Sequence, residues 1–112
     1  MKAILDTNFI LTCVKQKVDF FKFLEENGII AVIPEEVIGE LKKLPNTELA
    51  LKILEGEKFE TISIGNHVDK GIIELARKDE KLIIATLDKK LKEKFRNRKL
   101  VVKGKKQLEI IS

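Results

Sequence analysis

The sequence predicts an α/β fold with three layers, α/β/α, in which a mostly parallel central sheet of about five strands lies between helices. Two observations lead to this prediction. Short runs of apolar and β-branched residues alternate along the chain with segments of helical periodicity. The segments also follow one another as strand and helix units, the order that builds parallel sheets. No repeat or linker interrupts the 112 residues, so we expect a single domain over residues 1–112.

Each expected element has its own sequence signal. By apolar and β-branched enrichment, the expected strands are Lys2–Leu5, Ile29–Ile33, Phe59–Ile64, Leu82–Thr86 and Leu100–Lys103. By apolar periodicity, the expected helices are Asp19–Glu26, Pro34–Leu44, Thr47–Leu54, His67–Asp79 and Lys89–Asn97. Asn46 and Asn66 suit the N-cap position, and Gly28 and Gly56 follow helices as stop signals.

Composition excludes several classes of protein. No apolar stretch is long enough to span a bilayer and no secretory leader is recognisable, so we expect a soluble cytoplasmic protein. Cys13 is the only cysteine, which rules out an intrachain disulfide and a cysteine-rich zinc site. We expect Cys13 to be a small buried apolar residue.

Positive charge is concentrated near the end of the chain. The net charge is +4, yet residues 89–106 contain ten Lys or Arg and a single Glu. This basic window begins directly after Asp88 and predicts attraction to a polyanion such as RNA. The alternative is an ordinary solvated helix face rich in lysine.

Two acidic residues stand where buried strands are expected to end. Asp6 follows the apolar run Ala3-Ile4-Leu5, and Asp88 follows Leu82 to Leu87. Ligands of open α/β sheets bind at the carboxyl ends of the strands, so we expect both carboxylates at one edge of the sheet. The alternatives are a turn-forming Asp6 and an Asp88 that only caps the next helix.

Two more acidic residues are expected to approach the same edge from helices. Counting about 100° per residue, Asp69 falls on the apolar face of its helix, between Ala76 and Ile73. Glu40 falls at the margin of the apolar stripe Val37, Leu41 and Leu44. The alternatives are a boundary residue for Glu40 and a capping box with Asn66 for Asp69.

Four carboxylates at one place predict a metal site. Packed together they repel one another unless cations neutralise them. Ligation by oxygen alone favours hard ions, Mg²⁺ or Mn²⁺, which activate water and offset the charge of a phosphodiester transition state. The sequence contains no phosphate-binding P-loop or GxGxxG motif that would indicate nucleotide binding instead.

The chain resembles the PIN-domain ribonucleases over essentially its whole length. The segments that carry the resemblance are Asp6-Thr7-Asn8-Phe9-Ile10-Leu11, Val37-Ile38-Gly39-Glu40-Leu41, Val68-Asp69 with Ile72-Ile73-Glu74-Leu75-Ala76, and Ala85-Thr86-Leu87-Asp88. Their order and spacing are the specific feature. Many members of the family have Asn where Leu87 stands, which affects the assignment of a subfamily more than the carboxylate itself.

The resemblance implies a metal-dependent endoribonuclease. Its metal ligands and catalytic residues would be Asp6, Glu40, Asp69 and Asp88. Its supporting residues would be Thr7, Asn8 and Thr86. From the basic window itself we expect RNA phosphates to be held by Lys89, Lys90, Lys92, Arg96 and Arg98. Small members similar to VapC-type toxins and to rRNA-processing proteins imply an antitoxin or a ribosome-assembly factor as partner, and a homodimer.

Other readings stay open beside this one. A nonhydrolytic RNA-binding or assembly module on the same fold would use the basic window and not the acids, and a phosphate-relay receiver fold is a weaker third possibility. His67 is expected to be incidental. Phe20, Phe21 and Phe23 crowd one helix, which predicts core or dimer packing in preference to base stacking.

Overall fold

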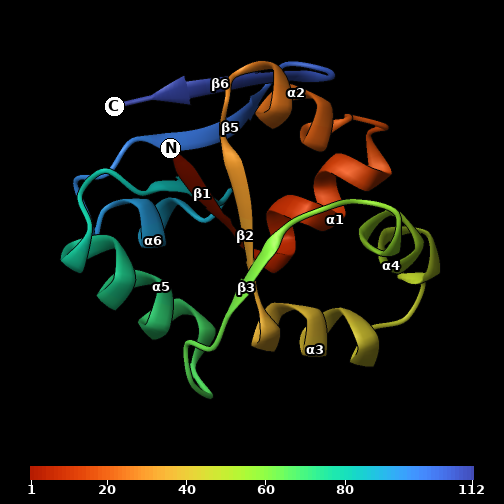
Figure 1. Cartoon of the computed structure of the whole chain (residues 1–112), viewed down its shortest axis with the longest axis horizontal. Helices are drawn as coiled ribbons and strands as arrows, with labels where there is room; N and C mark the ends of the chain where they lie inside the picture. The colour runs from red at the N-terminus through yellow and green to blue at the C-terminus, as the bar shows by residue number, and fades with distance from the viewer.

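A computed structural model describes residues 1–112 and contains one six-stranded sheet. The strands are β1 (Lys2–Leu5), β2 (Ile30–Pro34), β3 (Glu60–Ile62), β4 (Ile83–Ala85), β5 (Lys99–Lys103) and β6 (Gln107–Ile111). They lie in the order β3-β2-β1-β4-β5-β6 (Figure 1). All neighbours are parallel except β5 and β6, which are antiparallel. The predicted three-layer, mostly parallel α/β fold is confirmed.

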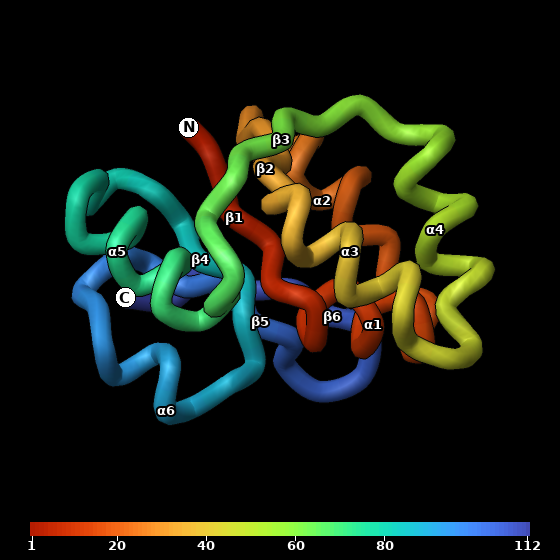
Figure 2. Tube along the Cα trace, turned by 90° about the horizontal axis from the view of Figure 1, so that it is seen from below, coloured from red at the N-terminus to blue at the C-terminus, as the bar shows by residue number.

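Helices cover both faces of the sheet. They are α1 (Thr7–Lys15), α2 (Phe20–Glu26), α3 (Glu35–Lys43), α4 (Glu48–Glu55), α5 (Val68–Lys78) and α6 (Lys89–Lys92). Helices α1 to α4 lie on one side of the sheet and α5 and α6 on the other (Figures 1 and 2). No helix is both long and apolar enough to cross a membrane.

The central strand β1 supplies side chains to both layers. Ala3 and Leu5 belong to the large core under α1 to α4, whereas Ile4 belongs to the smaller core under α5 and α6. All three side chains are at most 1% exposed. Successive side chains of a strand point to opposite faces, so a run that is apolar at every position is suited to a strand covered on both sides.

Two elements were not predicted. The helix α1 fills residues 7–15, where β-branched Ile10, Thr12 and Val14 weaken the helical signal. Phe9, Ile10 and Cys13 are buried at helical spacing and explain why the helix forms. The strand β6 was missed because it is a half-exposed edge strand, with a weaker apolar signal than the buried strands.

Several expected helix boundaries were wrong. The last helix ends at Lys92 and not at Asn97, because Asn97 is 2% exposed and donates from Nδ2 to the carbonyl oxygens of Asp79 and Leu82, both at 2.8 Å. Leu44 is 43% exposed because the chain becomes extended there. The N-caps of α4 and α5 are the residues after the expected ones, Thr47 and His67.

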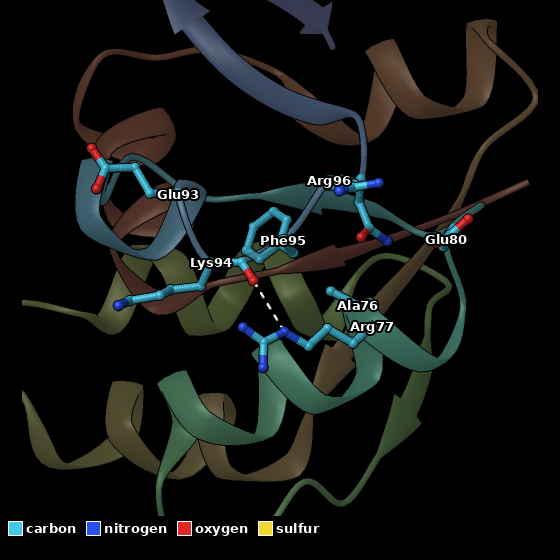
Figure 3. A pocket seen from close by; sticks show the side chains of 8 residues that line it. Ala76, Arg77, Glu80, Glu93, Lys94, Phe95 and Arg96 are labelled. Carbon is cyan, nitrogen blue, oxygen red and sulfur yellow. Dashed lines mark hydrogen bonds between the residues drawn. The ribbon is translucent and has the colours of Figure 1, made fainter.

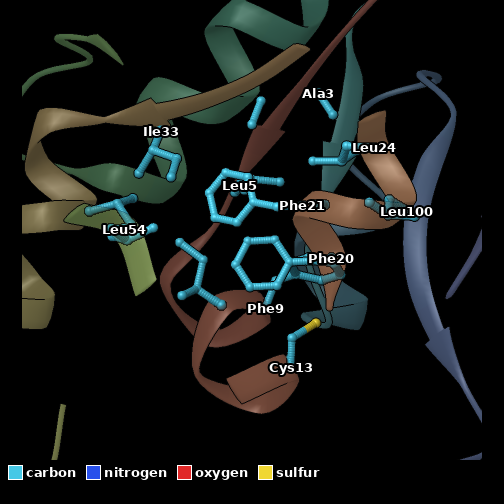
Figure 4. Packing of buried hydrophobic residues seen from close by; sticks show 14 of the residues in the cluster. Ala3, Leu5, Phe9, Cys13, Phe20, Phe21, Leu24, Ile33, Leu54 and Leu100 are labelled. Atoms are coloured by element: carbon cyan, nitrogen blue, oxygen red, sulfur yellow. The ribbon is translucent and has the colours of Figure 1, made fainter. Parts of the chain in front are cut away.

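The larger core is built around aromatic side chains. Phe20 packs edge-on against Phe9, with the two ring centroids 6.0 Å apart (Figure 4). The ring centroids of Phe20 and Phe21 are 4.7 Å apart. Phe20 and Phe21 are 2% and 7% exposed. Core packing is therefore confirmed for these two residues, which leaves them no role as a base-stacking platform.

The thiol of Cys13 lies inside this core (Figure 4) and is fully buried. Burial raises the pKa of Cys13 to about 12. We therefore expect no reaction with an alkylating reagent at pH 8 while the protein is folded, and complete reaction in denaturant. Mass spectrometry after brief alkylation measures both states, and rapid labelling of the native protein would contradict this packing.

Candidate carboxylate site

The ends of β1 and β4 bring Asp6 and Asp88 to the same edge of the sheet. The two strands pair in parallel, with Leu5 opposite Ala85. The ladder continues by one step, because the amide of Asp6 donates to the carbonyl oxygen of Ala85 at 3.0 Å. Asp88 lies three positions further, at the start of α6. The location predicted from the strand ends is confirmed.

The carboxylate of Asp6 is buried and held at both oxygens. Oδ1 accepts the amide hydrogen of Thr7 at 2.8 Å, and Oδ2 accepts the hydroxyl of Thr86 at 3.0 Å. Asp6 is only 5% exposed. It also serves as the N-cap of α1, so the turn-forming role and a place at the sheet edge are compatible.

Thr7 links the first helix to Glu40. Its hydroxyl donates to Oε1 of Glu40 at 2.6 Å, across 33 positions of sequence. Oε2 of Glu40 has no protein partner, and the residue is exposed. This fixed orientation of Glu40 was not predicted. The sequence does not tell which distant side chain the hydroxyl of Thr7 contacts.

Asp88 caps α6 with one oxygen only. Oδ1 accepts the amides of Lys90 and Leu91 at 2.9 and 3.2 Å, so Asp88 does cap this helix. Oδ2 has no protein partner, however, and remains available. The amide of Asp88 donates to the Thr86 hydroxyl at 3.2 Å, so this buried threonine bridges Asp88 and Asp6. Of the expected supporting residues, Thr86 therefore contacts the carboxylate of Asp6 and the amide of Asp88, whereas Asn8 is exposed and bonds to neither carboxylate.

Asp69 lies in the first turn of α5 and is exposed. The prediction that it faces the buried side was wrong. The position of a residue around a helix gives the direction of its side chain, but it does not tell whether another element covers the side chain there. The capping-box alternative was also wrong, because His67 is the N-cap and no side chain caps the helix. Asp69 is thus a free carboxylate without a hydrogen-bonded partner.

The position of α5 depends on Gly71. A Cβ atom at this glycine would lie 2.6 Å from Cβ of Ile64 and closer still to the Ile64 carbonyl oxygen. The helix therefore packs directly against the segment that follows β3. This close approach sets the position of Asp69, one half-turn earlier in the same helix.

The four carboxylates influence one another electrostatically. Burial raises the pKa of Asp6 most, and the charges of Asp69 and Glu40 raise it further, against the lowering by its hydrogen bonds. Partial desolvation also raises the pKa of Asp69, with further contributions from Asp88 and Glu40. In the present side-chain conformations no three acidic residues form a group that could hold a metal ion.

Asp69→Asn is expected to make the metal-free protein more stable at pH 7. The raised pKa means that ionised Asp69 disfavours the folded state above that pKa, and the effect vanishes below 3.8, where both states are protonated. Thermal melts in EDTA from pH 3.5 to 8 test this, with Glu74→Gln on the solvated part of α5 as the control. A variant less stable than wild type at pH 7 would contradict the raised pKa of Asp69.

The basic window does not form one surface. Lys89 and Lys90 are exposed beside Asp88 at the start of α6. Arg98 precedes β5, which is parallel to β4, so it lies at the opposite edge of the sheet, where its Nη2 contacts Sδ of Met1 at 2.8 Å. The predicted RNA contact of Arg98 is therefore remote from the carboxylates.

A pocket of about 370 Å³ lies between α5 and the segment after α6. Figure 3 shows its lining residues: Ala76, Arg77, Glu80, Glu93, Lys94, Phe95, Arg96 and Asn97. Arg77 closes one side by donating from Nε to the Lys94 carbonyl oxygen at 3.1 Å. Arg96 lines this pocket, whereas none of the four carboxylates does.

Comparison with known families agrees with this fold. Residues 3–107 match the PIN-like domain, and the chain belongs to this family. The family resemblance seen in the sequence is thereby confirmed.

Particular relatives are similar over most of the chain. Ribonuclease VapC4 of Methanocaldococcus jannaschii is 33% identical, with 97% of this chain and 95% of the relative covered. The rRNA-processing protein fcf1 of Schizosaccharomyces pombe is 35% identical over 84% of this chain, which spans about half of that protein, 53%. The structure of the PIN domain endonuclease Utp24 has a TM-score of 0.84 at 32% identity, covering 97% of this chain and 90% of the other.

Proposed function

We propose that the protein is a Mg²⁺- or Mn²⁺-dependent endoribonuclease that hydrolyses RNA phosphodiester bonds. The observation that carries this proposal is the hydrogen-bond network at one edge of the sheet, in which Thr7 and Thr86 link Asp6 to Glu40 and Asp88. Evolutionary similarity to a ribonuclease and to a PIN endonuclease supports the reaction class.

The donor chemistry suits a hard divalent ion. Asp6, Glu40, Asp69 and Asp88 would hold it, since carboxylate oxygens are the preferred ligands of Mg²⁺ and Mn²⁺. Glu40 and Asp88 each have one oxygen without a protein partner, and Asp69 has two. Side-chain rotations are needed, because the present conformations form no closed ligand group. When bound, such an ion activates water and offsets the charge that develops on the phosphate.

The residues of the chain have distinct tasks in this proposal. Thr86 and the amide of Thr7 fix the plane of the Asp6 carboxylate, and the Thr7 hydroxyl limits the rotation of Glu40. The carboxylates orient the attacking water. Lys89 and Lys90, beside Asp88, attract the RNA phosphates to this edge, and Lys92 extends the same charge along α6.

A nonhydrolytic RNA-binding or assembly module is the second candidate. It is favoured by the open arrangement of the acidic side chains, which form no metal-holding group as they stand. In this case the lysines would bind RNA and the acids would have no catalytic task.

RNA cleavage assays with and without metal separate the two candidates. A structured RNA is incubated with purified protein in EDTA, in Mg²⁺ and in Mn²⁺, and binding is measured in parallel. We expect cleavage only with a divalent ion, together with binding that weakens as salt rises. Binding that is equal in all three conditions, with no cleavage in any, would replace the nuclease by the binding module.

Two physiological roles are compatible with this activity, a toxin and an RNA-processing nuclease. A toxin would be paired with an antitoxin, as the similarity to VapC4 suggests, whereas a processing nuclease would join a ribosome-assembly partner, as the similarity to fcf1 suggests. Co-purification from the native source distinguishes a small inhibitory protein from pre-ribosomal RNA. We also propose a homodimer, which sedimentation at micromolar concentration tests.

A further inference from the structure

Glu36 binds the segment between β3 and α5 by three hydrogen bonds. Its Oε2 accepts the Ser63 hydroxyl at 2.7 Å and the Gly65 amide at 3.3 Å, and its Oε1 accepts the Ile64 amide at 2.9 Å. Glu36 belongs to α3, 28 positions away from Ile64 in sequence. One surface carboxylate thus holds three consecutive residues of a segment that has no ladder hydrogen bonds of its own.

The bound segment is the one against which α5 packs. Ile64 lies against Gly71 with no space for a Cβ atom, so a shift of Ile64 must be transmitted to the helix. Gly65 follows with a φ of +87°, a conformation that redirects the chain toward α5. The first turn of α5 then carries Asp69.

Glu36 and Glu40 are also one turn apart on the same helix. Residues at positions i and i+4 lie on the same side of a helix. Glu40 is fixed by Thr7, and its charge reaches Asp69. The same helix therefore presents Glu40 directly and holds the segment that leads to Asp69.

We propose that Glu36 is a positioning residue that sets the distance between Asp69 and Glu40, so that divalent-cation binding at the carboxylates depends on it. This inference rests on the proposed nuclease function. The hydrogen bonds from Ile64 and Ser63 keep the pKa of Glu36 below its ordinary value, so its charge is present throughout the neutral range.

Three variants isolate this role. Glu36→Ala removes all three acceptor contacts, and Glu36→Gln keeps one acceptor oxygen for the Ile64 amide. Glu35→Ala is the matched control, because Glu35 is an exposed neighbour in the same helical turn and accepts no side-chain hydrogen bond. Mn²⁺ affinity is measured by calorimetry without RNA, and hydrogen exchange by mass spectrometry reports on residues 63–70.

We expect Mn²⁺ binding to weaken about 10- to 100-fold in Glu36→Ala, the usual effect of losing a residue that orients metal ligands. Glu36→Gln should lie between Ala and wild type, and Glu35→Ala should match wild type. Exchange at residues 63–70 should rise in Glu36→Ala, whereas RNA binding in EDTA should not change.

Two results would overturn the inference, and they distinguish failure of the Glu36 role from failure of the nuclease proposal. If wild type binds Mn²⁺ and Glu36→Ala binds it equally well, Glu36 has no positioning role although the nuclease proposal stands. If wild type neither binds Mn²⁺ nor cleaves RNA, the nuclease proposal fails and the role of Glu36 fails with it.

Discussion

Asp6→Asn is expected to reduce metal-dependent RNA cleavage about 1,000-fold or more without lowering the melting temperature. A divalent ion supplies several kcal/mol of transition-state stabilisation, and a loss of about 4 kcal/mol corresponds to this factor. Asp6 is the most buried of the four carboxylates and the one held at both oxygens. The neutral amide of asparagine has the same shape but lacks the charge that would hold a cation in the proposed site.

The folded state should tolerate this change. The asparagine oxygen can still accept the Thr7 amide, and the Thr86 hydroxyl can turn to accept the new amide hydrogen. Because burial raises the pKa of Asp6, removing its charge also removes a cost of folding at neutral pH.

Initial rates of cleavage in Mn²⁺ and thermal melts in EDTA measure the two effects separately. Glu74→Gln is the control, since it removes an exposed carboxylate from α5 away from the sheet edge. Cleavage that persists in Asp6→Asn, purified in the same way, would assign the activity to other residues or to a contaminant.

Gly71→Ala is expected to destabilise the protein by about 2 kcal/mol or more, the usual cost of a side chain for which there is no space. Its Cβ would overlap with Ile64, so α5 and the preceding segment must separate. For a domain of this size we expect the melting temperature to fall by roughly 8 °C. Cleavage should fall as well, because Asp69 moves with the helix.

Gly39→Ala gives the opposite result in a matched experiment. Gly39 is in α3, and a Cβ atom there meets no heavy atom within 4 Å. Alanine lowers the conformational freedom of the unfolded chain and favours the helix, so we expect a gain of about 0.5–1 kcal/mol. Urea denaturation of both variants measures the pair, and equal effects at the two glycines would contradict the close contact at Gly71.

The central strands β1, β2 and β4 could be predicted because they are buried on both faces. The run Ile83 to Ala85 is apolar at every position, and each residue is fully buried. The edge strand β6 was missed because none of its residues is buried, and its sequence is mixed in polarity. The helix α1 was missed because its β-branched residues favour a strand locally, while tertiary packing of Phe9 and Cys13 favours the helix.

The candidate site was predictable to a different degree for each residue. Asp6 and Asp88 follow from the ends of parallel strands, which topology alone brings to one edge. The exposure of Asp69 did not follow, because it depends on where the neighbouring layer ends. The contacts of Glu36 gave no signal, because two of its three partners are backbone amides, which are identical in every sequence.

The central place of β1 has a consequence for how the chain folds. The bond from Thr86 to Asp6 joins residues 80 positions apart, and β1 gains its second neighbour only when β4 docks beside it. Such long-range closure makes folding slower than in helical bundles, whose contacts are local. We therefore expect Thr86 to reach Asp6 late in folding, after the local contacts within the helices have formed.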